Sequence, residues 1–101
     1  MTELLSDSEV ADRLRNLPGW SAANAATSAL TRTLKFDDFK AALNFVNRVG
    51  DEAEGLNHHP DIDIRWNKVT LTLSTHSAGG LTERDFTLAH RIDDRAAEFP
   101  Q

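Results

Sequence analysis

Two short stretches of alternating apolar and polar residues, separated by a polar pair, constrain the fold of this chain more than any other feature. Over residues 61–66 two isoleucines and a tryptophan fall on one parity, and over residues 69–75 a valine and two leucines do the same. A period of two is the pattern of a half-buried strand. The pair between them is Asn67–Lys68, and Asn tolerates the positive φ that tight turns need. The pattern predicts an antiparallel hairpin closed at Asn67–Lys68, with the valine and leucines facing the core.

Three further segments have the apolar spacing of amphipathic helices. The first begins at Ser6, where Ser6 and Glu9 match the capping-box pattern. The second covers residues 38–54, and we expect Gly55 to end it, because glycine is the usual left-handed residue after a helix. The third opens at Thr82.

A short strand beginning at Trp20 and a longer one over residues 29–36 complete the elements, although Arg32 interrupts the apolar row of the second. The order is therefore helix, strand, strand, helix, strand, strand, helix. Hairpins favour an antiparallel sheet, and amphipathic helices must bury their apolar stripes against another element. The sequence predicts an α+β two-layer sandwich, with a four-stranded antiparallel sheet and three helices on one face. We expect a single domain over residues 1–101.

Charge and composition exclude several functional classes. The net charge is −5 and the 11 Lys and Arg residues are scattered, whereas phosphate binding needs clustered cations, so nucleic acid is not an expected partner. The absence of cysteine excludes disulfides, thiol catalysis and thiolate metal sites. No apolar run is long enough to cross a bilayer, and residues 1–8 lack the pattern of a signal peptide. We therefore expect no membrane association and a cytoplasmic location.

Three of the four histidines lie within a span of nineteen residues, and the predicted hairpin brings them together. His58 and His59 lead into the first strand of the hairpin, and His76 ends the second. Counting outward from a turn at Asn67–Lys68 places His59 near His76. His76 has the parity of the polar face, so it points away from the core or lies at its rim. Neighbouring residues in extended backbone point opposite ways, so His58 and His59 are not expected to do the same job.

Imidazole rings suit proton transfer near neutral pH. Two histidines that face one substrate can remove water from it, because one ring protonates the departing hydroxyl while the other accepts a proton from the neighbouring atom. Glu54, four residues before His58, can hydrogen-bond a ring N–H or a polar substrate group. A zinc site built from the three histidines is the alternative. Adjacent histidines diverge in extended backbone, however, and no familiar metal-binding spacing is present, so we expect no metal and no other cofactor.

Two other residues have both a structural and a functional interpretation. Trp66 can be a core residue of its strand or a platform on which a substrate stacks. Asp85 lies three residues after Thr82, where an acid completes a capping box and complements the helix dipole. Taken alone, the histidine pair is also compatible with an ordinary surface loop.

The joint spacing of these residues resembles the signature of the pterin-4a-carbinolamine dehydratase family. It runs Glu54, three residues, His58-His59-Pro60, five residues, Trp66, nine residues, His76, eight residues and Asp85. The stretch from Asn67 to Asp85 is similar to the hairpin and helix entry of the same family. Each element alone is weak, but the combination is specific, and no motif position departs from it.

The resemblance implies an activity and a site. The family dehydrates 4a-hydroxytetrahydropterin to the quinonoid dihydropterin without a metal, which regenerates the cofactor of aromatic amino acid hydroxylases. By position, His58 and His76 would be the acid–base pair, and His59 would chiefly bind and orient the substrate. The remaining candidates for binding the substrate or shaping its site are Glu54, Pro60, Trp66, Thr75 and Asp85.

The resemblance also implies the same antiparallel sheet with three helices on one face, and assembly of copies through sheet edges and helices. We therefore expect a homodimer or homotetramer, a small-molecule pterin as the ligand, and a functional link to an aromatic amino acid hydroxylase. The alternative is a non-catalytic protein-binding module on the same scaffold, comparable to the dimerisation cofactors among animal members of the family.

Overall fold

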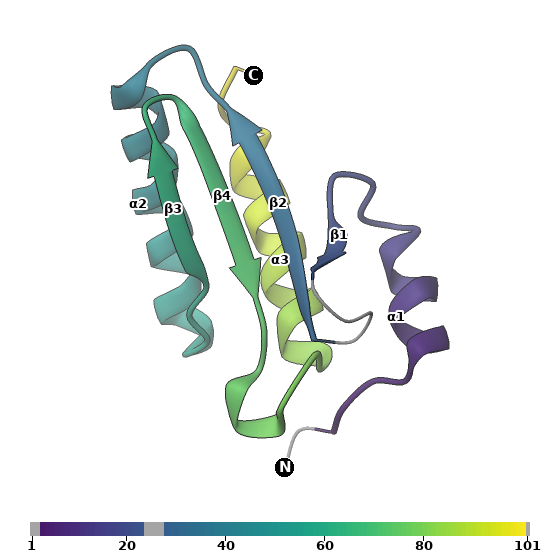
Figure 1. Cartoon of the computed structure of the whole chain (residues 1–101). Coiled ribbons are helices and arrows are strands. Elements are labelled where there is room, and N and C mark those ends of the chain that lie inside the picture. Colours follow the sequence, from purple (N-terminus) through teal and green to yellow (C-terminus); the bar gives the residue numbers. More distant parts are fainter. Residues whose placement is uncertain (1–2, 24–27, 101) are drawn as a thin grey trace.

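A computed structural model describes residues 3–23 and 28–100 of the chain. Its elements, labelled in Figure 1, are α1 (Asp7–Leu14), β1 (Ser21–Ala23), β2 (Ala29–Lys35), α2 (Phe39–Leu56), β3 (Asp61–Arg65), β4 (Lys68–Leu73), the 3-10 helix η1 (His76–Ala78) and α3 (Glu83–Ala96). This is the predicted order of helices and strands, with one added 3-10 turn after β4.

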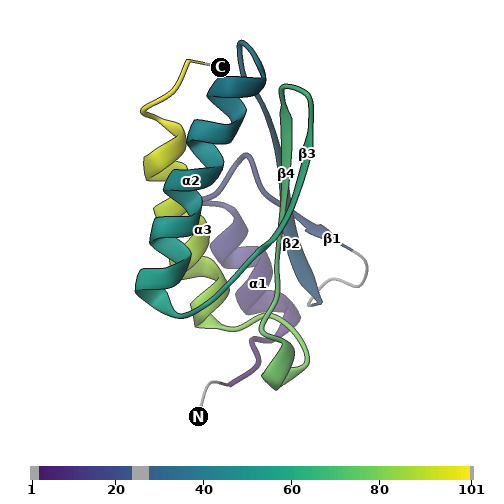
Figure 2. The same cartoon turned by 90° about the vertical axis from the view of Figure 1, so that its left-hand side faces the viewer.

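The strands form one four-stranded antiparallel sheet in the order β1-β2-β4-β3. The second hairpin therefore has β4 inside the sheet and β3 at its edge. Figure 2 shows α1, α2 and α3 on the same side of this sheet. The predicted α+β two-layer sandwich, with three helices on one face, is confirmed.

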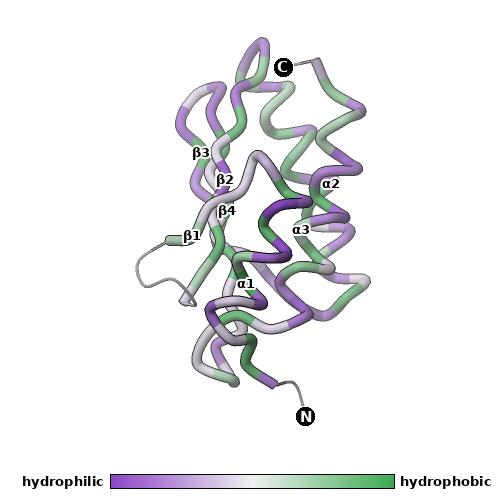
Figure 3. Tube along the Cα trace, turned by 90° about the vertical axis from the view of Figure 1, so that its right-hand side faces the viewer, coloured by the Kyte–Doolittle hydropathy of each residue, from purple (hydrophilic) through white to green (hydrophobic). Residues whose placement is uncertain are grey.

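The core lies between the two layers, and the alternating residues of the strands fill it from the sheet side. The largest fully buried side chains include Leu30, Leu71, Leu73, Phe45, Leu88 and Ile92. Each such side chain contributes about 1.5–3 kcal/mol when it leaves water. Hydrophobic and hydrophilic residues alternate along α1 and α3 in Figure 3, as expected for helices that bury one face.

The second hairpin turns one residue earlier than predicted. The last pair of its ladder is Arg65 with Lys68, so the turn consists of Trp66 and Asn67. Asn67 is held against the end of β2, because the Phe36 N–H donates to the Asn67 carbonyl at 2.8 Å and the Asn67 amide donates to the Phe36 carbonyl at 2.9 Å. Trp66 consequently takes a left-handed φ of 51° and is 68% exposed. Of the two interpretations of Trp66, the one that makes it a core residue of its strand is wrong.

Helix α2 does not end at Gly55 as predicted. It continues to Leu56, and Asn57 takes the left-handed conformation with φ 48°. The N–H of His58 then donates to the Ala53 carbonyl at 3.1 Å, the six-to-one bond that closes many helix C-termini. Because this bond fixes its backbone to the helix, His58 leaves α2 in a defined direction.

Arg32 lies on the helix-covered side of the sheet, which explains the break in the apolar row of β2. Its guanidinium donates to Asp93 of α3 at 2.5 Å, and the same carboxylate oxygen accepts from the Trp20 indole at 2.8 Å. A partly buried charge is tolerated when it is paired in this way.

Candidate active site

A cavity of about 240 Å³, which we call the histidine cavity, lies between the segment after α2 and the segment between β4 and α3. His58, His59 and His76 all line it. The remaining lining residues are Asn57, Ser74, Thr75, Ser77 and Arg84. The structure thus brings together the three histidines that the sequence singled out.

The register that brings them together differs from the predicted one. Asp61 pairs with Thr72, and continuing this register places His59 across from Ser74 and His58 across from Thr75. The predicted pairing of His59 with His76 is wrong, because the turn lies at Trp66–Asn67. His76 lies beyond β4, at the first position of η1 rather than in the strand, and its side chain is exposed.

His58 is the buried member of the three. Only 8% of it is exposed, and its Nε2 lies 2.6 Å from Oδ1 of Asp85, which is fully buried. An ionised carboxylate only accepts hydrogen bonds, so Nε2 of His58 carries the proton in this pair. This arrangement leaves Nδ1 as the ring nitrogen that can exchange a proton with a bound molecule.

Asp85 is held from three sides. Its second oxygen, Oδ2, accepts from the Thr75 hydroxyl at 2.8 Å and from the backbone N–H of Thr82 at 3.0 Å, and the two threonine hydroxyls lie 2.7 Å apart. The predicted capping-box role of Asp85 at the start of α3 is confirmed. Asp85 is not among the residues that line the histidine cavity, so its influence on a ligand passes through His58.

His59 and His76 have more open surroundings. The side chain of His59 is exposed, and its Nε2 lies 2.5 Å from a carboxylate oxygen of Glu54. Within residues 3–23 and 28–100, the side chain of His76 forms no hydrogen bond. One histidine is therefore fixed by a buried carboxylate, one is paired with an exposed carboxylate, and one is free to turn toward a ligand.

Other predicted site residues lie outside the histidine cavity. Trp66 is at the closed end of the second hairpin, whereas the cavity is at its open end. Five strand residues separate these ends, which corresponds to about 16 Å at a rise of about 3.3 Å per residue. Pro60 leads into β3 without lining the cavity, and Glu54 reaches the site through His59. Thr75 does line the cavity, where it is buried.

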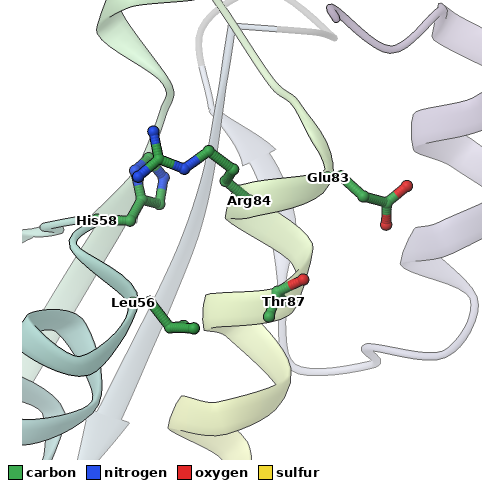
Figure 4. Close-up of a pocket in the computed structure, with 5 residues that line it drawn as sticks. All are labelled: Leu56, His58, Glu83, Arg84 and Thr87. Atoms are coloured by element: carbon green, nitrogen blue, oxygen red, sulfur yellow. The ribbon is translucent and has the colours of Figure 1, made fainter. Parts of the chain in front are cut away.

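Arg84 is a cavity residue that the sequence reasoning missed. Its guanidinium donates to the Asn57 carbonyl at 2.6 Å, which ties the first turn of α3 to the end of α2. Figure 4 shows Arg84 extending toward His58 while Glu83 points away. These two residues and His58 also line an adjoining space of about 240 Å³ with Leu56 and Thr87, which we call the helix cavity. The sequence signal that could have pointed to Arg84 was its position inside the capping box, directly before Asp85.

Neither a metal-binding cluster nor a membrane-spanning helix is found in the part of the chain that the structure describes. Within residues 3–23 and 28–100, no group of three or more His, Cys, Asp or Glu side chains is arranged to hold a metal ion. No helix in those ranges is both long enough and apolar enough to cross a membrane.

A small α+β protein with a histidine-lined cavity backed by a buried carboxylate has the equipment of an acid–base enzyme. Comparison with known sequences gives the family. Residues 3–95 match the family model described as pterin 4 alpha carbinolamine dehydratase, and the chain belongs to this family.

Relatives match over nearly the whole chain. A Nocardia farcinica protein whose name carries the words pterin-4-alpha-carbinolamine dehydratase is 53% identical over 95 residues, covering 94% of this chain and 97% of the relative. A protein from Roseiflexus castenholzii with the same words in its name is 49% identical, covering 93% of this chain and 98% of its own length.

Solved structures agree with the fold. A crystal structure described as a transcriptional coactivator/pterin dehydratase from Brucella melitensis superposes with a TM-score of 0.88 at 38% identity, covering 93% of this chain and 99% of the other. A second structure, described as a pterin dehydratase-like RuBisCO assembly factor, has a TM-score of 0.65 at 22% identity and covers 77% of this chain and 89% of the other. That second likeness shows the fold alone.

Proposed function

We propose that this protein dehydrates 4a-hydroxytetrahydropterin to quinonoid dihydropterin and water. The observation that supports the proposal most strongly is the position of His58 and His76 on one cavity, with His58 backed by the buried carboxylate of Asp85. The family match supports the same reaction.

The reaction needs one proton donor and one proton acceptor. One ring of the His58–His76 pair protonates the hydroxyl on C4a, which leaves as water, while the other accepts the proton of N5. The electrons of the N5–H bond form the C4a–N5 double bond, so atoms and electrons balance without an oxidant or a co-reactant. Each turnover leaves the two rings with exchanged protonation states, and exchange with water resets them.

Different surroundings suit the residues to different roles. Asp85 holds the His58 ring in one orientation and one tautomer, and it stabilises the ring when it is protonated. His76 is exposed and can turn toward the substrate. His59, paired with Glu54, binds and orients the pterin, and Thr75 holds Asp85 in place.

The cellular role follows from this chemistry. Removal of the 4a-hydroxyl returns a spent pterin to a form that can be reduced again, so the protein would serve tetrahydrobiopterin recycling beside an aromatic amino acid hydroxylase. We also propose a cytoplasmic location and assembly into a homodimer or homotetramer, as expected from the sequence.

Rapid-mixing measurements of the dehydration rate test the proposal. His58→Ala and His76→Ala should each lower kcat by about 10²- to 10⁴-fold, the usual contribution of a general acid or base. His90→Ala is the matched control, because His90 is exposed on α3 and does not line the histidine cavity. A double variant of His58 and His76 that keeps the wild-type rate would contradict their assignment as the acid–base pair. A wild-type protein that does not raise the dehydration rate above that of the uncatalysed reaction would contradict the proposal and favour the non-catalytic protein-binding module.

A further inference from the structure

A second cavity adjoins the histidine cavity on the outer face of the sheet, and we call it the outer-face cavity. Its volume is about 340 Å³, and its lining includes Ser28, Asp61, Thr72, Ser74 and His76. Ser74 and His76 line both cavities. The two spaces therefore meet at His76, one of the two residues to which we assign proton transfer.

The proposed reaction restricts where the substituent on C6 of the pterin can lie. N5 loses a proton and C4a loses a hydroxyl, so the proton-transfer histidines must reach both atoms. C6 is bonded directly to N5. The first atom of a group carried by C6 is therefore two bonds from a reacting atom, and the group leaves the ring close to the histidines. The outer-face cavity begins at such a point, because His76 forms part of its wall.

We infer that the outer-face cavity holds the C6 substituent of the substrate, and that Asp61 and Thr72 select a neutral, hydroxylated substituent. This inference rests on the proposed dehydratase function. Asp61 and Thr72 are direct partners in the β3–β4 ladder. Cβ atoms of such partners lie about 4.5–5.5 Å apart, so one short hydroxylated chain can contact both side chains. Two strands fix the spacing, which makes the pair a rigid recognition element.

The hydrogen-bonding groups of the cavity match hydroxyls rather than an anion. The Asp61 carboxylate accepts, and the Thr72 hydroxyl both donates and accepts. Ser74 donates its hydroxyl proton to the Ser28 carbonyl at 2.7 Å, so its oxygen remains available as an acceptor. Of the described lining residues, Asp61 is the one with a fixed formal charge, and it repels a phosphorylated or carboxylated substituent.

The helix cavity is the competing location. It adjoins the histidine cavity through His58 and Arg84, and its other lining residues include Leu56. The Arg84 guanidinium would favour a negatively charged substituent there, because Glu83, the carboxylate of that lining, points away from His58 and pairs with Arg13. The two locations therefore predict opposite preferences between a neutral hydroxylated substituent and an anionic one.

The test compares kcat/KM for three 4a-hydroxytetrahydropterins generated in situ, with methyl, 1,2-dihydroxypropyl or phosphorylated dihydroxypropyl groups on C6. Wild-type protein should prefer dihydroxypropyl over methyl and methyl over the phosphorylated group. Asp61→Ala should lower the ratio of dihydroxypropyl to methyl by about tenfold, because it removes a hydrogen bond to a charged acceptor. Thr72→Val should lower the same ratio by about threefold.

Asp63→Ala and Thr70→Val are the matched controls. Asp63 and Thr70 are direct partners on the same two strands, two residues further along, and do not line the outer-face cavity. They should leave the ratio unchanged. The inference would be overturned if wild type, Asp61→Ala and Thr72→Val had the same ratio of kcat/KM for dihydroxypropyl over methyl. It would also be overturned if Arg84→Gln, rather than these two variants, lowered that ratio. Absence of turnover with all three substrates in wild type would refute the dehydratase function itself, so the two failures are distinguishable.

Discussion

Replacing Asp85 by Asn tests how the buried carboxylate controls the site. The Oδ2 position of Asp85 receives two donors, the Thr75 hydroxyl and the Thr82 N–H, so the carbonyl oxygen of Asn should take that position. The NH₂ group of Asn then faces Nε2 of His58. Because both groups cannot donate to each other, the ring proton of neutral His58 must move to Nδ1. The substitution therefore keeps the shape of the network but reverses the tautomer of His58.

Two effects of different size follow. His58 with its proton on Nδ1 cannot accept a proton there, and its protonated form would set an N–H against the Asn NH₂ group. We expect kcat to fall by about 10²- to 10³-fold, within the range of acid–base contributions. The lost charge-assisted hydrogen bond should also lower the unfolding free energy by about 1–3 kcal/mol. For a chain of this length each kcal/mol corresponds to about 4–8 °C in Tm.

A double-mutant cycle with His58→Ala shows whether Asp85 acts through His58. Once His58 is removed, Asp85→Asn should change kcat by less than about threefold, because the coupled residue is gone. Asp93→Asn is the control, since Asp93 is a partly buried, hydrogen-bonded carboxylate on the same helix that does not line the histidine cavity. It should lower Tm without a comparable loss of kcat. A folded Asp85→Asn variant with wild-type kcat would refute the tautomer argument.

Two further predictions concern residues at the ends of elements. Arg84→Gln should lower kcat/KM by about tenfold, because it removes the charged donor to the Asn57 carbonyl that joins α2 to α3 at the cavity; steady-state kinetics that match wild type would show that Arg84 does not support the site. Trp66→Asn should raise the unfolding free energy by about 1 kcal/mol, because Asn tolerates the positive φ of 51° and little burial is lost; a lower urea midpoint would indicate that the Trp66 side chain stabilises the chain by contacts.

The sequence was sufficient for the fold because its local signals agree with one another. Alternation defined the second hairpin, and the capping boxes at Ser6 and Thr82 formed as predicted. The turn could not be located from local chemistry, because a contact with Phe36, distant in sequence, determines where Asn67 lies. The end of α2 was displaced for a related reason. Glycine favours a helix end but does not impose one, and Asn57 supplied the left-handed residue.

The meeting of the three histidines at one cavity was predictable, but the contacts around them were not. Hairpin geometry was enough to bring the histidines together, since a register error of two residues still leaves both ends of the hairpin adjacent. No sequence pattern joins His58 to Asp85, because that bond depends on how the end of α2 meets the start of α3. Arg84 was missed for the same reason, since its partner is a backbone carbonyl on another element.

One carboxylate links the stability of helix α3 to the chemistry of the site. Oδ2 of Asp85 caps the helix through the Thr82 N–H, and Oδ1 orients His58. A capping acid normally lies at the surface, where its contribution is modest. Here burial removes competing water, so the same hydrogen bonds that begin the helix also hold the His58 ring in one orientation. A disturbance of the first turn of α3 would therefore be transmitted to His58 without any contact between the disturbed residue and the substrate.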